Sequence, residues 1–233
     1  WNAKEEKLKP TDMEGRDGTS SWSWDIDALV GNLGNSYKIM ECGMKAFPTE
    51  ALTHTHLSCL LNAMIGNNLN YTDIKEVQVT CFAQAYDILF DPTKYRPESR
   101  ETADHSLPYC LAAAMVDKKI TTESFSDEKL NDPRIYEVID KIKGQPSQEF
   151  EKMFPAKQPS KVVVTTNDGR QFEEYLEYPK GDPREPMTMD DLENKFNSLV
   201  GDKLNDDQKK QLKNTIFNCE EMSANDFMTA LNI

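Results

Sequence analysis

Several residue patterns that mark common catalytic sites are missing from this 233-residue sequence. It contains no His-Glu-x-x-His, no Gly-x-Ser-x-Gly, no phosphate-binding loop and no Gly-x-Gly-x-x-Gly, so zinc hydrolases, serine hydrolases and nucleotide-binding enzymes are weak candidates. Only three histidines occur. Two of them, His54 and His56, stand two positions apart, which on a helix points their rings in different directions. They are therefore a poor chelating pair.

Cysteine is sparse, and the five cysteines never form a Cys-x-x-Cys pair. Zinc ribbons and iron–sulfur clusters normally need such pairs, and a disulfide scaffold is untypical of a chain of this size with so few cysteines. We expect small buried thiols in a reducing compartment, the cytoplasm or the mitochondrial matrix. These cysteines are Cys42, Cys59, Cys81, Cys110 and Cys219.

Positive charge and long apolar runs are also in short supply. The chain has 27 Lys and Arg against 40 Asp and Glu, a formal charge of −13, which argues against nucleic-acid or anionic-membrane surfaces. No apolar run approaches the ~20 residues that span a bilayer. Hydrophobic residues at 38% are few for a compact globule but too many for a disordered chain. The length allows one large domain or two small ones.

The periodicity of the first half predicts helices and strands. A polar connector precedes a short amphipathic stretch over residues 22–30, which we expect to be helical. Alternation over 36–42 and 74–88 predicts two strands. Between them, apolar residues recur at i, i+3, i+4 and i+7 and predict a helix that starts after Pro48 and ends near Gly66. These residues are Leu57, Leu60, Leu61 and Met64.

Turn and cap residues punctuate the second half. An Ala-rich helix should open at Asp104 with Pro108 in its first turn, and Asp132-Pro133 should start a helix with an apolar stripe that runs to Ile142. Asp168-Gly169 between alternating runs predicts an antiparallel hairpin. Beyond it, residues 179–186 resemble a linker, and three helices should follow, two of them opened by capping boxes at Thr188 and Ser223.

These patterns predict an α+β fold. We divide it into a connector with a short helix (1–35), an α+β body with an antiparallel or mixed sheet (36–180) and a helical segment (181–233). The chain begins at Trp1 without a Met or a signal-peptide pattern, which we interpret as a cut.

Seven short strings, in their order and spacing, resemble the C-terminal half of the MmgE/PrpD family. That family includes 2-methylcitrate dehydratases, cis-aconitate decarboxylases and an iminodisuccinate epimerase. The resemblance covers nearly everything from Trp24 onward. The strings are Lys45-Ala-Phe-Pro48, Thr53-His54, Ser106-Leu-Pro-Tyr109, Asp132-Pro-Arg134, Asp168-Gly-Arg170, Tyr178-Pro-Lys-Gly-Asp-Pro183 and Lys195-Phe196.

The resemblance implies a two-part enzyme. Family members combine a large all-helical domain, built mostly from the N-terminal half, with a smaller α+β lid, and the final helices return to pack on the large domain. This chain then corresponds to the lid and the returning helices. Its expected partners are the N-terminal helical half, as a separate chain or a lost segment, and further copies in a dimer or other oligomer.

The family's active site implies a metal-free and cofactor-free chemistry on small di- or tricarboxylates, in the cleft between the two domains. By this resemblance, Lys45 lines the cleft and clamps a carboxylate or stabilises an enediolate. His54 and Thr53 lie at a helix start, where backbone amides favour anions. Tyr86 matches a cleft tyrosine. The alternatives are a solvated lysine, a structural histidine and a core aromatic side chain.

Two further candidates are less direct. Glu50 stands where decarboxylase-like relatives carry a histidine, whereas dehydratase-like relatives carry Phe-Pro-Ala-Glu but lack the lysine, so neither activity transfers cleanly. His105 beside Asp104 suggests an oriented acid/base pair, with a helix cap as the favoured alternative. We thus predict Lys45, His54 and Tyr86 as catalytic residues and Thr53, Glu50 and His105 as substrate contacts.

The leading functional hypothesis is the lid half of a cofactor-independent lyase, a dehydratase or decarboxylase such as those of propionate metabolism. Most remaining acid/base residues of the family come from the helical half, so the isolated chain should be inactive. The alternatives are a non-catalytic subunit that serves assembly in a larger complex, and a fragment of a longer protein.

Overall fold

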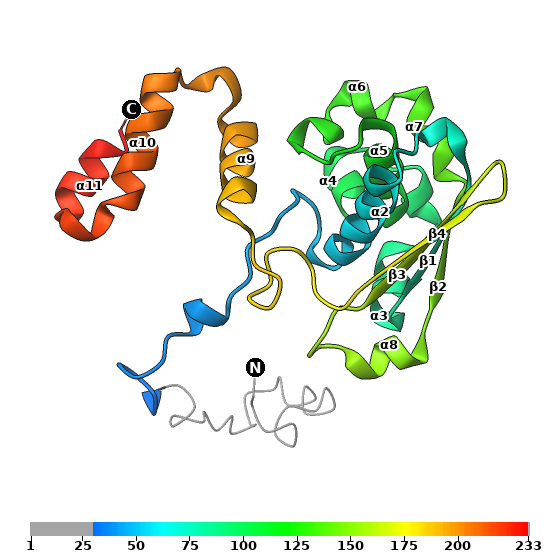
Figure 1. Cartoon of the computed structure of the whole chain (residues 1–233), viewed down its shortest axis with the longest axis horizontal. Coiled ribbons are helices and arrows are strands. Elements are labelled where there is room, and N and C mark those ends of the chain that lie inside the picture. The colour runs from blue at the N-terminus through cyan, green and yellow to red at the C-terminus, as the bar shows by residue number, and fades with distance from the viewer. Residues whose placement is uncertain (1–29, 233) are drawn as a thin grey trace, which may run out of the picture. The chain divides into compact units, whose positions relative to one another are not determined.

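The computed structural model describes residues 30–232 (Figure 1). The chain divides between Cys42 and Gly43 into two compact units. Most of the predicted connector and of the helix predicted over 22–30 lies outside the described residues. Among those described, no helix combines the length and the apolar character needed to cross a membrane.

Residues 30–42 contain a short 3-10 helix, η2 (Lys38–Glu41), so the strand predicted over 36–42 is wrong. The backbone turns there, with the Cys42 amide donating to the Ile39 carbonyl at 3.2 Å. Tyr37 and Ile39, which the alternation places on one face of the predicted strand, are 65% and 75% exposed. An alternating sequence needs a neighbouring strand and an apolar layer to become a strand, and these described residues have neither.

The helix predicted after Pro48 is confirmed. A single 3-10 turn, η3 (Ala51–Thr53), leads into α2 (His54–Gly66), which ends where the sequence places its last residue. Leu57, Leu60 and Met64 are 0–1% exposed, so the predicted stripe is the face that α2 gives to the core.

Four strands form one mixed sheet in the order β2-β1-β3-β4. β1 pairs in parallel with β2 and antiparallel with β3, and β3 and β4 form the hairpin predicted at Asp168-Gly169. Gly169 has φ +87°, the left-handed conformation that such a turn needs. The strands are β1 (Ile74–Cys81), β2 (Ile142–Pro146), β3 (Ser160–Thr166) and β4 (Gln171–Leu176).

Two predicted boundaries are wrong around this sheet. The strand predicted over 74–88 stops at Cys81, opposite the last residue of β2, and α3 (Ala83–Leu89) follows because Phe82 turns the chain and Ala-Gln-Ala favours a helix. The apolar stripe predicted to reach Ile142 also ends early. α7 (Pro133–Ile139) stops before that residue, whose side chain is buried from within β2 instead.

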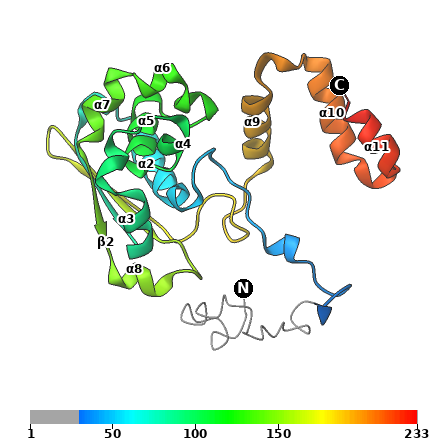
Figure 2. The same cartoon turned by 180° about the vertical axis from the view of Figure 1, so that it is seen from behind.

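Helices α2, α3 and α5 cover one face of the sheet (Figures 1 and 2). Helix α5 is the centre of the core, since its residues from Leu107 to Met115 are all buried, and Pro108 lies in its first turn as predicted. Its N-cap is Ser106, not Asp104. The remaining helices of the body are η4 (Tyr71–Asp73), η5 (Pro92–Tyr95), α4 (Arg100–Asp104), α5 (Leu107–Asp117), η6 (Thr122–Phe125), α6 (Asp127–Leu130) and α8 (Gln148–Met153).

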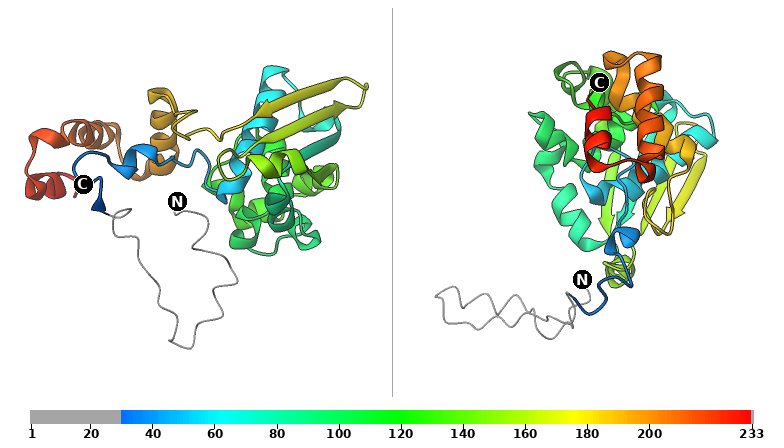
Figure 3. Two further views of the ribbon diagram at one scale, coloured as in Figure 1. Left: turned by 90° about the horizontal axis from the view of Figure 1, so that it is seen from below. Right: turned by 90° about the vertical axis from the view of Figure 1, so that its left-hand side faces the viewer.

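The helical segment contains the three helices expected after the linker-like stretch. Thr188 closes the predicted capping box with Asp191, and Ser223 accepts from the Asp226 amide at 3.1 Å. Figure 3 shows these helices and the β3–β4 hairpin from two further sides. Their bounds are α9 (Met189–Val200), η7 (Gly201–Lys203), α10 (Asp206–Phe217), η8 (Cys219–Glu221) and α11 (Ala224–Ala230). The α+β fold class is therefore confirmed.

Candidate functional site

The loop that carries Lys45 is fixed by a contact with the linker-like stretch of residues 179–186. The Met44 amide donates to the Gly181 carbonyl at 2.8 Å. Gly181 has φ +94°, and a Cβ on it would lie 1.9 Å from the Met44 carbonyl oxygen, so this approach requires glycine. The Gly-containing string of residues 178–183 thus holds the Lys45 loop in place.

The start of the first long helix is closed by its own side chains. The Glu50 carboxylate accepts from the Leu52 amide at 2.6 Å and so caps η3. The Thr53 hydroxyl donates to the Glu50 carbonyl at 2.7 Å and also lies 2.7 Å from the Thr49 hydroxyl. Thr53 is fully buried. Both predicted substrate contacts are therefore engaged in local capping bonds.

His54 is buried beside this cap. Its Nε2 lies 3.4 Å from the Thr49 carbonyl oxygen, and its ring meets the Phe47 ring edge-on at 5.4 Å. The pKa of His54 is lowered from its usual 6.5 to about 4, chiefly by burial; the hydrogen bond to Thr49 opposes this shift, and the charges of Lys45 and Lys195 add to it. At neutral pH the imidazole is uncharged.

Lys45 completes a cluster around Thr49. Its ammonium group donates to the Thr49 carbonyl at 2.9 Å, the same oxygen that His54 Nε2 approaches. Lys45, Thr49, Glu50, Thr53 and His54 form what we call the Thr49 cluster. The structure therefore brings together four of the six predicted site residues.

His105 lies next to the Thr49 cluster along the backbone. It is the C-cap of α4 and half-exposed, and its Nδ1 contacts an Asp104 carboxylate oxygen at 2.5 Å. The Asp104 carbonyl accepts from the Glu50 amide at 3.0 Å, which ties this corner to the cluster. The predicted Asp–His pair is present. The idea that this step caps the start of the Ala-rich helix is wrong, because Ser106 does so.

Tyr86 lies elsewhere. It is on α3, not at a strand end, and it stacks on Phe90 with ring centroids 5.7 Å apart. Within residues 30–232, no hydrogen bond or ring contact joins Tyr86 to the Thr49 cluster. Its assignment as catalytic stays a prediction.

Sequence reasoning missed two members of this neighbourhood. Thr49 is not among the predicted site residues, yet its main-chain carbonyl is the shared acceptor of the cluster. Lys195 on α9 donates to the Lys45 carbonyl at 2.7 Å across 150 positions of sequence. No local spacing signals such a contact, although Lys195-Phe196 is one of the strings shared with the family.

His56 belongs to the core and not to the cluster. Its Nδ1 lies 2.5 Å from the Ser160 hydroxyl on β3, and burial lowers its pKa to about 3. Since His54 faces Thr49 and His56 faces β3, the prediction that they do not chelate together agrees with their geometry. Among the described residues, no group of three or more His, Cys, Asp or Glu side chains is placed to hold a metal ion.

The thiols divide into two groups. Cys59, Cys81 and Cys110 are buried as expected, and burial raises the pKa of Cys59 and of Cys81 to about 12. Cys42 and Cys219 are exposed, so the expectation of buried thiols is wrong for them. Cys42 follows η2 and Cys219 begins η8, and neither of these 3-10 helices contains a buried residue.

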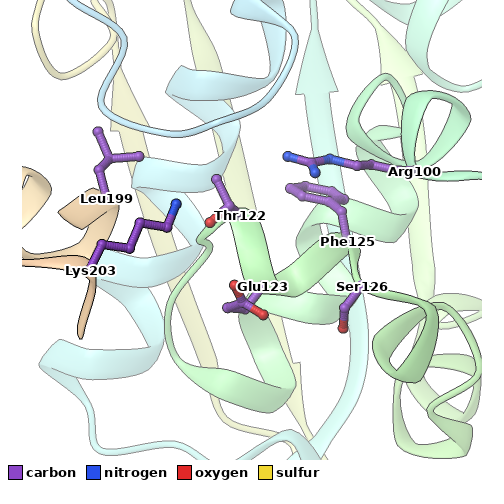
Figure 4. A pocket seen from close by; sticks show the side chains of 7 residues that line it. All are labelled: Arg100, Thr122, Glu123, Phe125, Ser126, Leu199 and Lys203. Carbon is purple, nitrogen blue, oxygen red and sulfur yellow. The ribbon is translucent and has the colours of Figure 1, made fainter. Parts of the chain in front are cut away.

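A cavity of about 350 Å³ lies away from the Thr49 cluster (Figure 4). Its lining combines cationic, acidic, hydroxyl and apolar side chains, and none of the predicted site residues lines it. The lining residues are Arg100, Thr122, Glu123, Phe125, Ser126, Leu199 and Lys203.

Known proteins resemble this chain over most of its length. It is 22% identical over 204 residues to a cis-aconitate decarboxylase of Aspergillus terreus, covering 84% of this chain and 41% of that protein. It is 27% identical over 135 residues to the mouse cis-aconitate decarboxylase and 28% over 141 residues to the human one, covering 58% of this chain and 28% of each relative. The chain thus spans about two-fifths or less of these relatives.

The family model for the MmgE/PrpD C-terminal domain matches residues 47–220. That range contains the whole sheet, the first long helix with His54, and α9 with Lys195. The resemblance seen in the short sequence strings is thereby confirmed, and the chain belongs to the MmgE/PrpD family.

Proposed function

We propose that this chain supplies the lid part of a lyase that acts on a small di- or tricarboxylate such as cis-aconitate or 2-methylcitrate. The observation that carries this proposal is the Thr49 cluster. There a lysine ammonium and a neutral buried imidazole meet at one helix start, and Lys195 adds a second positive charge. The relatives named cis-aconitate decarboxylase support the substrate class.

The cluster suits anion binding more than proton transfer. The ammonium of Lys45 pairs with a substrate carboxylate and favours negative charge that develops on it during the reaction. His54, with its pKa near 4, is not a proton donor at neutral pH. In this chain its role is to hold the Thr49 carbonyl, and through it Lys45, by hydrogen bonding.

A decarboxylation shows what the rest of the enzyme must add. Loss of a carboxyl group as CO2 leaves an electron pair that an adjacent unsaturated carboxylate delocalises, and a proton then replaces the lost group. The lysines stabilise the charged intermediate, and the proton needs an acid. We assign that acid to the N-terminal helical half of the family, which makes that half a necessary partner.

Binding of tricarballylate, a saturated tricarboxylate that cannot react, tests the site in this chain. A charge-assisted hydrogen bond contributes about 1.5–3 kcal/mol, so Lys45→Met should weaken binding about tenfold or more in calorimetric titration. Lys45→Arg should retain part of the affinity. Lys152→Met is the matched control, because Lys152 on α8 is exposed and has no ion pair within the described residues. Equal affinity in Lys45→Met and the wild type contradicts the proposal.

Turnover tests the need for the helical half. Incubated alone with cis-aconitate or 2-methylcitrate, the chain should form no product. Product should appear when a chain that carries the helical half is present. Robust turnover by the 233-residue chain alone rejects the proposed division of labour.

One observation favours a second candidate, a non-catalytic subunit that serves assembly. Glu50 stands where the resemblance implies a histidine in decarboxylase-like relatives, and its carboxylate is engaged with the Leu52 amide at 2.6 Å. A chain retained for assembly would form a stable complex with the chain that carries the helical half, as measured by size-exclusion chromatography with light scattering. Its Lys45→Met variant would behave like the wild type in both binding and complex formation.

A further inference from the structure

Helix α9 is fastened to the loop that carries Lys45. The Lys195 ammonium donates to the Lys45 carbonyl at 2.7 Å. In the first turn of the helix, Asp191 pairs with Lys180 at 3.0 Å. Gly181, next to Lys180, accepts from the Met44 amide through its carbonyl. The main chain of the Lys45 loop is therefore held at Met44 by Gly181 and at Lys45 by Lys195.

Lys45 and Lys195 place two positive charges near the buried ring of His54. Lys45 and Lys195 are the charged groups whose fields lower the pKa of His54. The nearest carboxylate of the cluster, Glu50, is directed to the Leu52 amide. Lys45 donates to a main-chain carbonyl and Lys195 does the same, so neither ammonium is neutralised by an acid in these contacts. A small anion with more than one carboxylate matches such a pair better than a monocarboxylate.

We propose that Lys195 has two roles: it holds the Lys45 loop through the Lys45 main-chain carbonyl, and its charge makes the Thr49 cluster a two-lysine site for polycarboxylates. This inference rests on the proposed function and adds to it a residue from the helical segment. The site is then complete only while α9 is docked on the loop.

The three histidines of the chain provide the measurement. In protein labelled with 15N-histidine, the ring signals of His54, His56 and His105 can be followed separately against pH. Lys195→Met removes a charge that lowers the pKa of His54, so that pKa should rise. His56, buried against β3, and His105 are internal references that should not change. Lys195→Arg should restore the wild-type curve.

Ligand preference gives the second readout. Lys195→Met should lose about tenfold in affinity for tricarballylate and less than threefold for propionate, which carries one carboxylate. Lys152→Met should leave both affinities unchanged. An unchanged His54 curve together with an unchanged preference in Lys195→Met overturns the inference.

The failure of the proposed function looks different. If the wild type binds neither acid while Lys195→Met still shifts the His54 curve, the carboxylate function is rejected and the contact between Lys195 and the Lys45 loop is upheld. Loss of the fold in Lys195→Met would show as a change in all three histidine signals. In that case Lys195→Arg, which keeps the charge, replaces it as the test. Wild-type affinity of Lys195→Arg for tricarballylate supports the role of the charge, and a loss of affinity contradicts it.

Discussion

The body over residues 43–178 and the helical segment over 189–232 keep their structures by different means. The body buries a continuous apolar core between helices and sheet, with α5 buried on every side. In the described part of the segment, Thr215 alone is classed as buried, and large side chains such as Phe217 and Met228 are 65% and 64% exposed.

The segment's helices rely on their ends instead. Thr188 and Asn205 close capping boxes, and Ser223 caps the last helix. Each cap contributes about 1 kcal/mol, far less than the burial of a core side chain. The body and the helical segment should therefore respond to different perturbations. Changes in burial should act on the body, and changes in caps and charges on the segment.

A fall in pH should give the largest difference in stability between the body and the helical segment. His54 and His56 have pKa values of about 4 and 3 in the folded body against about 6.5 unfolded. The unfolded chain therefore takes up protons first, and stability is lost as pH falls from about 6.5 towards these folded values. Each histidine should cost about 2 kcal/mol between pH 7 and pH 5, roughly 4 kcal/mol together.

Urea denaturation at the two pH values measures this loss. The described segment contains no histidine, so its helical content should respond weakly to acid between pH 7 and pH 5. His56→Gln should remove the contribution of that residue and flatten the pH dependence by about half. A stability that is independent of pH over this range contradicts the burial of both rings.

Two leucines give a matched test of burial. Leu111 on α5 is fully buried, whereas Leu199 on α9 is 53% exposed. Leu111→Ala should lower the free energy of unfolding by about 3 kcal/mol, because it removes buried methyl groups and leaves a cavity. Leu199→Ala should change it by less than about 0.5 kcal/mol. Similar losses in the two variants, measured by urea denaturation, would show that α9 shares the core of the body.

What the sequence predicts well is local. The hairpin at Asp168-Gly169, the cap at Thr188 and the buried stripe of α2 each follow from residues within about ten positions of one another. The strand predicted over 36–42 failed because alternation says nothing about whether a partner strand exists. The strand over 74–88 ran too far because its parallel partner ends at Pro146, a long-range fact.

The candidate site follows the same rule. Lys45, Glu50, Thr53 and His54 lie within ten positions, so their meeting could be predicted from the turn at Pro48 and the helix that follows. Lys195 is 150 positions away, and only the folded chain brings it to the Lys45 carbonyl. The family resemblance alone assigns Tyr86 to the site, and the structure places this residue on α3, apart from the contacts of the Thr49 cluster.

The smallest expected effect concerns the cap of α9. The Thr188 hydroxyl accepts from the Asp191 amide at 3.1 Å, and the Asp191 carboxylate accepts from the Thr188 amide at 2.8 Å. Thr188→Ala removes one of these bonds and should cost α9 about 1 kcal/mol, seen as faster amide hydrogen exchange in its first turns. The urea midpoint of the body should stay unchanged, and Thr188→Ser should behave like the wild type. A fall in the stability of the body would instead show that the cap and the core form one cooperative unit. Because Asp191 also pairs with Lys180, a loosened first turn of α9 should weaken tricarballylate binding slightly.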